Sequence, residues 1–156
     1  MISIRFMSRD DLTPTSKVHA EAFVRQRKSL EWLECNLSAF PRFMCFVAEV
    51  DDSIVGYITW SQKSGFRPQA VLELEQIAVL PAFQGGGIGE MLIRESLPFV
   101  QAQLCEQEST LKHIVVTTRA DNKARRLYEK ALGAEVEATI RNLFSADEVF
   151  MIARDV

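Results

Sequence analysis

Long apolar runs are scarce in this 156-residue sequence, and their absence excludes a membrane-spanning protein. No stretch approaches the ~18 consecutive apolar residues that a helix needs to cross a bilayer. The segment from Met1 to Asp10 carries charge at Arg5 and Arg9 and has no apolar core, so it does not resemble a secretory signal. We therefore expect a cytoplasmic protein with no membrane partner.

Cysteine and histidine are also rare, with three and two copies. An odd number of cysteines without a C-x-x-C spacing favours a reduced, intracellular setting over a disulfide framework. The two histidines, His19 and His113, lie far apart and have no partner at metal-ligand spacing, so we expect no metal site. The cysteines are Cys35, Cys45 and Cys105.

An excess of positive charge is missing as well. Lysine and arginine total 18 against 21 aspartates and glutamates, which gives a net charge of −3. This balance argues against a general nucleic-acid binder. The length and the 47% apolar content suit one globular domain with a substantial core, and we find no linker or repeat. We therefore expect a single domain over residues 1–156.

Hydrophobic periodicity predicts strands in both halves of the chain and helices between them. Because strands alternate with helices only in the second half, the sheet should be mixed. We predict an α/β fold (α+β type) with one mixed, mostly antiparallel sheet of about seven strands and four helices. The strand-like runs are 2–6, 43–50, 54–60, 71–80, 113–118, 136–140 and 149–153, and the helix-like runs are about 12–25, 30–40, 88–107 and 120–132.

The most informative stretch is Gln84-Gly-Gly-Gly-Ile-Gly89, which stands between a strand-like and a helix-like run. Glycines at this place remove side chains that would keep a ligand from the backbone, and they permit conformations that aim several N–H groups at one point. The N-terminus of the following helix adds a favourable dipole for an anion. The loop therefore predicts a phosphate-bearing ligand.

Two common phosphate motifs do not fit this loop. A Walker A loop requires Lys and Ser or Thr after its last glycine, but Glu90 and Met91 follow Gly89. The dinucleotide pattern Gly-x-Gly-x-x-Gly fails too, because its third glycine would fall on Glu90 or Leu92. The spacing that fits is Gln-x-x-Gly-x-Gly, at Gln84, Gly87 and Gly89.

Set behind Gln76-Ile-Ala-Val-Leu-Pro81, this spacing resembles the acyl-CoA site of the GCN5-related N-acetyltransferases, the GNAT family. The helix Asp121-Asn-Lys-Ala-Arg-Arg-Leu-Tyr-Glu-Lys-Ala-Leu-Gly133 is similar to the family's second motif. The start of the chain, with Ile4-Arg5, Asp10-Asp-Leu12 and His19-Ala-Glu-Ala-Phe23, is similar to its first strand and helix. The resemblance spans nearly the whole chain.

The resemblance implies a GNAT-like fold with splayed central strands and acetyl-CoA as cosubstrate. The backbone of Ile77 and Val79 would line the pantetheine arm, and the N–H groups of residues 85–90 would hold the pyrophosphate. Homodimers are common in the family, so the resemblance allows one here. The cofactor-binding residues that we expect are Ile77, Ala78, Val79, Gln84, Gly85, Gly86, Gly87, Ile88, Gly89, Glu90 and Asn122.

Acetyl transfer to an amine requires a base for the ammonium proton and an acid for the leaving thiolate. By resemblance, Tyr128 points at the CoA sulfur and is the acid candidate. Glu73 and Glu75 stand at even spacing on the strand before the glycine loop, and both are candidates for the base. Glu73 is our first choice because its distance from Val79 matches the base of histone-type family members. The competing interpretations are a core tyrosine and solvated or salt-bridged strand glutamates.

The acceptor is left open by the sequence. We expect a small-molecule primary amine, with Trp32, Phe40, Phe43 and Phe66 as candidates for an aromatic wall that suits an ammonium group. A protein N-terminus or lysine is one alternative; residues 138–142 resemble a strand of ribosomal-protein N-terminal acetyltransferases, but residues 115–118 lack the acid that those enzymes use. A regulatory module that binds acyl-CoA without turnover is the other.

Overall fold

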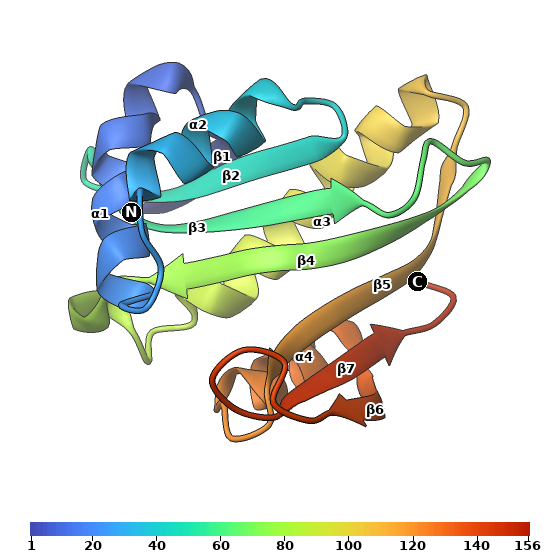
Figure 1. Ribbon diagram of the computed structural model, residues 1–156. Helices are drawn as coiled ribbons and strands as arrows, with labels where there is room; N and C mark the ends of the chain where they lie inside the picture. Colours follow the sequence, from blue (N-terminus) through green and yellow to red (C-terminus); the bar gives the residue numbers. More distant parts are fainter.

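The computed structural model describes all 156 residues as one seven-stranded sheet with helices on both faces (Figure 1). The strand order is β1-β2-β3-β4-β5-β7-β6, and only β4 and β5 pair in parallel. This confirms the predicted fold class. The elements are β1 (Ile2–Phe6), α1 (Leu12–Ala22), α2 (Ser29–Ser38), β2 (Phe43–Val50), β3 (Ser53–Gln62), β4 (Gln69–Val79), α3 (Ile88–Glu106), β5 (Thr110–Arg119), α4 (Ala124–Leu132), β6 (Glu135–Ile140) and β7 (Glu148–Ala153), with short 3-10 turns η1 (Arg9–Asp11) and η2 (Pro81–Phe83).

Several element boundaries differ from the sequence expectation by one to four residues, among them the start of β5 at Thr110, and two helix ends have a visible cause. Helix α4 begins at Ala124 and not near residue 120, because the side chain of Asn122 accepts a hydrogen bond from the Ala124 N–H (2.9 Å). Helix α1 ends at Ala22, and a turn follows in which the Gln26 N–H donates to the Phe23 carbonyl (2.9 Å). The predicted stop of α4 at Gly133 is confirmed, with φ of +69°.

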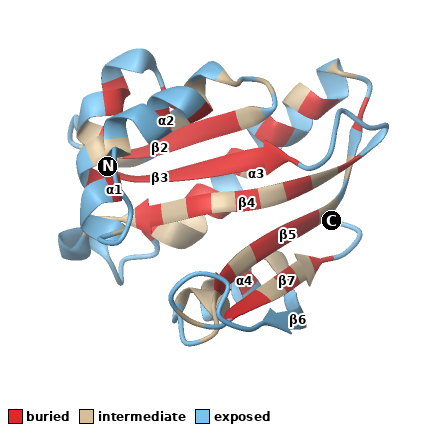
Figure 2. Ribbon diagram, viewed as in Figure 1, coloured by how far each residue is buried: buried red, intermediate tan, exposed pale blue.

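The sheet separates two apolar clusters. The larger contains Trp60, Leu72 and Leu92 and lies on the face that α3 covers. The smaller contains Tyr57, Leu33 and Val18 and lies under α1 and α2. Figure 1 shows α1 and α2 in front of the sheet and α3 behind it, and Figure 2 shows β2 and β3 buried between these layers. No helix combines the length and the apolar character needed to cross a membrane.

A bulge in β4 determines which of its side chains face α1 and α2. Thr59 of β3 pairs with Gln76, but the next residue, Trp60, pairs with Leu74, so Glu75 is an extra residue. A bulge of this kind re-aims the side chains that follow it. Before the bulge, the even-numbered residues Leu72 and Leu74 point into the larger cluster. After the bulge, the odd-numbered residues Ile77 and Val79 pack against that cluster.

The centre of the sheet is splayed. Strands β4 and β5 pair only from Gln69 to Glu73 on β4, and no pairing to β5 continues toward Val79. Strand β5 instead stays paired with β7 as far as Arg119. The last six residues of β4 therefore present one open edge, as the predicted splayed strands require.

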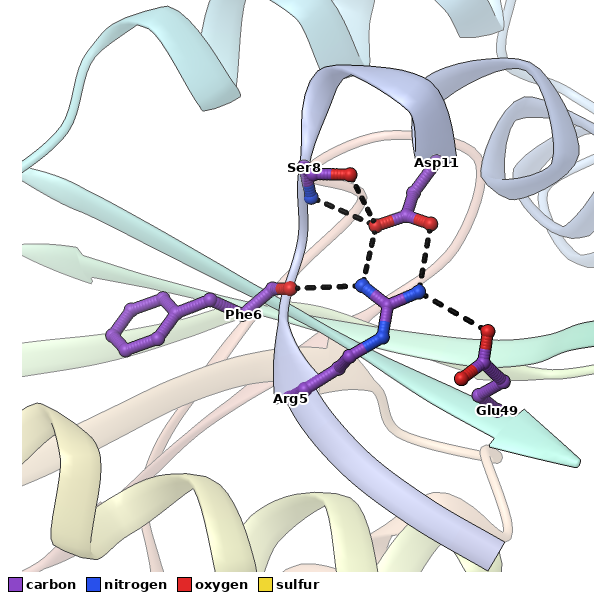
Figure 3. Close-up of polar contacts among 5 residues, drawn as sticks. All are labelled: Arg5, Phe6, Ser8, Asp11 and Glu49. Carbon is purple, nitrogen blue, oxygen red and sulfur yellow. Dashed lines mark hydrogen bonds and ion pairs between the residues drawn. The ribbon is translucent and has the colours of Figure 1, made fainter. Parts of the chain in front are cut away.

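An ion-pair cluster ties β1 to the start of the α1 layer (Figure 3). Arg5 donates to both carboxylate oxygens of Asp11 (2.7 and 2.9 Å) and to Glu49 on β2 (3.2 Å). Asp11 also accepts from the N–H and the hydroxyl of Ser8 (2.8 and 3.0 Å). These donors, Arg5 above all, hold the pKa of buried Asp11 below its usual range.

Candidate active site

The open edge of β4 exposes backbone groups at the predicted positions. The Leu80 N–H donates to the Val55 carbonyl across β3 (2.8 Å). Because N–H groups of successive strand residues point to opposite edges, Val79 and Ile77 direct theirs to the opening between β4 and β5. These two residues therefore have the orientation that binding an extended arm along the strand requires.

The glycine loop offers donors to an anion. None of the N–H groups of Gly85, Gly86 and Gly87 makes a hydrogen bond within the protein, and no side chain caps the N-terminus of α3. The first N–H groups of α3 are also free, as at any helix start. Together with the helix dipole, these groups form a cradle that fits the pyrophosphate of acetyl-CoA.

The glycines of the loop have different structural roles. Gly85 and Gly87 adopt φ of +84° and +86°, a left-handed conformation that favours glycine, and a Cβ on either would point into open space at the cradle. A Cβ on Gly89 would lie 3.1 Å from Leu127 on α4. Gly89 therefore allows α4, which carries Tyr128, to pack closely against the start of α3.

Two of the expected cofactor residues already have side-chain partners that hold the loop and the start of α4 in place. Gln84 donates to the Val79 carbonyl (2.9 Å), which ties the loop back to the end of β4. Asn122 bridges the Ala124 N–H and the Thr118 hydroxyl, so its side chain anchors the start of α4. These side chains support the cradle from behind.

Glu90 lies in the first turn of α3, where its carboxylate contacts Lys130 (3.0 Å) and Arg94 (2.8 Å). These two cations, Lys130 first, hold the pKa of Glu90 below its usual range. The Glu90 carboxylate thus links α3 to α4 through Lys130. The backbone N–H groups of this turn, and not the Glu90 side chain, are the groups that suit a phosphate. Ile88 and Ala78 are buried, so their side chains belong to the two apolar clusters.

Tyr128 projects from α4 into the larger apolar cluster and is only 5% exposed. Its hydroxyl makes no hydrogen bond within the protein and is not among the fully enclosed unpaired polar atoms, so the oxygen remains accessible. Burial raises the pKa of Tyr128 to about 12. The phenol therefore keeps its proton at neutral pH and is free to donate it to a ligand atom.

Glu73 and Glu75 lie together on the α1/α2 face of β4 but differ in their partners. Lys63 contacts the Glu73 carboxylate (3.3 Å) and neutralises it. Ser61 donates to Glu75 (3.2 Å), and burial, followed by the charge of Glu73, raises the pKa of Glu75. A base needs a pKa close to the working pH. The surroundings thus favour Glu75 over our first choice, Glu73, which already has a cation bound.

A partly buried hydrogen-bond chain lies on the α1/α2 side of the same site. The side-chain oxygen Oε1 of Gln76 accepts hydrogen bonds from Trp32 Nε1 (3.0 Å) and from the Tyr57 hydroxyl (2.8 Å). The Gln76 amide donates to Gln26 Oε1 (3.0 Å), which also contacts His19 Nε2 (2.8 Å). The loop between α1 and α2 is therefore fastened to β4 next to Glu75.

Among the four aromatic candidates, only Trp32 bonds to a residue beside the glutamates. Its indole N–H points inward to Gln76 while the ring stays 39% exposed. Phe40 packs edge-on against Phe6 (6.3 Å between ring centres), Phe43 lies under Arg42, and Phe66 is exposed in the β3–β4 loop. The aromatic wall that we expected is thus reduced to one side chain.

Comparison with known proteins decides the family. A model of the acetyltransferase (GNAT) family matches residues 7–134. The chain belongs to the GNAT family. A protein of Archaeoglobus fulgidus described as an uncharacterized N-acetyltransferase is 28% identical over 137 residues, which cover 81% of this chain and 89% of that protein. The resemblance noted in the sequence is therefore confirmed.

Solved GNAT-like structures share the fold at low sequence identity. An aminoglycoside 6'-N-acetyltransferase in complex with coenzyme A is 15% identical, with a TM-score of 0.76 and coverage of 99% of this chain and 97% of that one. NAA60 of Arabidopsis thaliana in complex with acetyl-CoA is also 15% identical, with a TM-score of 0.79 and coverage of 97% of both chains. At this identity, the likeness concerns the fold alone.

Membership of the GNAT family makes this protein an acetyl-CoA-dependent acetyltransferase. The fit is visible in the chain itself, because the free N–H groups of the glycine loop and the open edge of β4 are the places where a pyrophosphate and an extended arm can bind. No group of three or more His, Cys, Asp or Glu side chains is placed to hold a metal ion.

Sequence reasoning missed the bulge and the residues that line the acceptor side of this GNAT site. One signal was present: the apolar residues of β4 change phase between Leu74 and Ile77. The roles of Gln26, Gln76 and Lys63 had no such signal, because their contacts join segments that are far apart in the chain.

Proposed function

We propose that this GNAT protein transfers the acetyl group of acetyl-CoA directly to a primary amine of a small molecule. The observation that carries the proposal is the opening of β4 from β5, with Glu75 on one side of it and the free hydroxyl of Tyr128 on the other. Acetyl-CoA, when bound, supplies an activated acetyl thioester. Holding it beside the amine provides much of the rate by proximity.

The protein's own residues accept and donate the protons of the reaction. Glu75 accepts a proton from the ammonium group, which frees the nitrogen lone pair for attack on the thioester carbon. Tyr128 gives its phenolic proton to the sulfur as the carbon–sulfur bond breaks, and the nitrogen of the new amide returns its remaining surplus proton to the Tyr128 oxygen. Glu73 is the alternative base, and its contact with Lys63 is the reason that we rank it second.

The attachment of α2 and the loop before it to β4 is the observation that favours a small amine over a protein segment. The bonds from Gln76 to Trp32 and Gln26 fasten α2 and the preceding loop over the α1/α2 side of β4. The partly exposed indole of Trp32 is bonded to Gln76, the residue after Glu75, and an aromatic ring near a carboxylate suits an ammonium ion through cation–π and charge attraction. An extended peptide would need an open groove at this place.

Acceptor turnover tests the proposal. Release of CoA thiol and the mass of the product are measured with a panel of small primary amines and, in parallel, with peptides that carry a free N-terminus or a lysine. We expect acetylation of small amines with kcat/KM well above that of any peptide. Acetylation of peptides alone would replace the proposal by the protein-acceptor alternative, and binding of acetyl-CoA without any transfer would favour the regulatory module.

A further inference from the structure

A positively charged depression adjoins the two glutamates of β4. It measures about 700 Å³, and no carboxylate is among its lining residues, although the chain as a whole has a net charge of −3. A volume of this order is typical of small-ligand sites. We call it the basic depression, and it is lined by Lys63, Arg67, Gln69, Val71, Lys112 and His113.

The basic depression lies on the same face of the sheet as Glu73 and Glu75. Val71 precedes Glu73 by two residues on β4, so both side chains point to one face. Its neighbour on β5, His113, pairs with Val71 and precedes Ile114, which points into the larger cluster on the opposite face. A ligand can therefore reach from Glu75 along β4 to the depression without crossing the sheet.

Two donors of the basic depression, His113 and Arg67, are held in place, and a third, Lys112, is unpaired. The Asp155 backbone N–H donates to His113 Nδ1 (3.1 Å), so the neutral ring carries its proton on Nε2. Arg67 is held by two hydrogen bonds to the Ser64 carbonyl (3.0 and 3.2 Å), which leave one guanidinium nitrogen free. Lys112 forms no ion pair, whereas the charge of Lys63 is already balanced by Glu73.

We propose that the basic depression binds an anionic group of the acceptor, so that the acceptor is a primary amine that also carries a carboxylate or a phosphate. Val71 and Glu75 are four residues apart, so at about 3.3 Å per residue the amine and the anion are separated by at most about 13 Å, since the bulge at Glu75 interrupts the regular strand. The ammonium group would lie at Glu75 and Trp32, and the anion at Lys112, Arg67 and His113. This inference rests on the proposed function and narrows its substrate class.

The test uses four amines of one chain length: ω-aminooctanoate, ω-aminooctyl phosphate, octylamine and diaminooctane. We expect kcat/KM to be at least about tenfold higher for one or both anionic amines than for octylamine, and lowest for the diamine. The preferred anion identifies carboxylate or phosphate. Equal kcat/KM for the anionic and the neutral amine would overturn the inference while leaving the proposed function intact.

Charge reversal supplies the matched comparison. Lys112→Glu should lower the preference for the anionic amine over octylamine by about tenfold. Lys17→Glu, the same change at an exposed lysine of α1, should leave that preference unchanged. Equal effects of the two substitutions would show that net charge, and not the depression, sets the preference.

A binding measurement separates this inference from failure of the proposed function. With the CoA site filled by CoA, inorganic phosphate is titrated into the protein while the imidazole resonances of His113 are followed by NMR. We expect a saturable shift in the wild type that is lost in Lys112→Glu. If no amine is turned over but this shift is seen, the acceptor proposal fails and the anion site stands; absence of a saturable shift overturns the site.

Discussion

The two glutamates of β4 show how neighbours assign different roles to identical side chains. Glu73 forms an ion pair with Lys63, whereas burial, followed by the charge of Glu73, raises the pKa of Glu75. At the other side of the opening, burial raises the pKa of Tyr128 to about 12 and keeps the phenol protonated. This difference is the reason that we propose Glu75 as the proton acceptor and Tyr128 as the proton donor.

Replacing Tyr128 with Phe should lower kcat about a hundredfold, because the departing thiolate loses its proton donor. Affinity for acetyl-CoA should change little, since the ring and its packing remain. Steady-state kinetics and calorimetric titration measure the two quantities. An unchanged kcat would mean that Tyr128 is a core residue only.

Replacing Glu75 with Gln should lower kcat about a hundredfold or more, whereas Glu73→Gln should retain most of it. The pH profile gives a sharper test, since a base acts only when unprotonated and activity must rise as the pH passes its pKa. Glu73→Gln removes a negative charge that raises the pKa of Glu75, so the rising limb should move to lower pH. An unmoved limb would contradict this coupling.

At the scale of elements, most of the architecture could be predicted from the sequence. Periodicity predicted every helix and strand in order, because each element buries one face and the pattern repeats at its own period. Helix ends were less accessible: the start of α4 depends on where the Asn122 side chain bonds. The contacts on the α1/α2 side of β4 could not be predicted, because Gln26 and Gln76 meet only when α1 and α2 pack on β4.

The turn between β4 and α3 yields a prediction about the cofactor. Gly87→Val places a side chain in the cradle and strains a backbone with φ of +86°, so affinity for acetyl-CoA should fall by at least about tenfold. Gly65→Val is the control, because Gly65 also has positive φ and open space around its Cβ but lies in the β3–β4 loop. Calorimetry should find near-normal affinity in the control. Normal affinity in Gly87→Val would contradict the role of the loop.

At the scale of the whole molecule, the sheet is held at its β1 edge by polar contacts and at its centre by two cores. Arg5 joins β1, β2 and η1 through Asp11 and Glu49, and therefore orients the α1 layer that covers the acceptor side. The splay at β4 is tolerated because β5 keeps its pairing with β7. An open edge can thus exist in the middle of a continuous sheet.

Arg5→Met should lower the free energy of unfolding at neutral pH by about 1–2 kcal/mol, a range reduced by solvent screening of the partly exposed guanidinium. The pKa of Asp11 is lowered in the folded state, so its stabilisation is present above its unfolded pKa of about 3.9 and is lost as the pH falls through the folded value. The variant should show a weaker acid dependence in urea unfolding.

Arg9→Met is the control for that experiment, because it removes the exposed pair between Arg9 and Glu34 (2.9 Å) on the same side of the fold. Such a pair contributes about 0–1 kcal/mol. Equal losses in the two variants would show that the Arg5 cluster has no special role.

The measurement that tests the account most directly is the initial-rate pattern with acetyl-CoA and a turned-over amine both varied. Direct transfer across the opening of β4 predicts intersecting double-reciprocal lines and no acetylated protein in the intact mass spectrum after incubation with acetyl-CoA alone. Parallel lines together with a stoichiometric acetylated form of the protein would contradict it, because they would place a covalent step on the enzyme before the amine arrives.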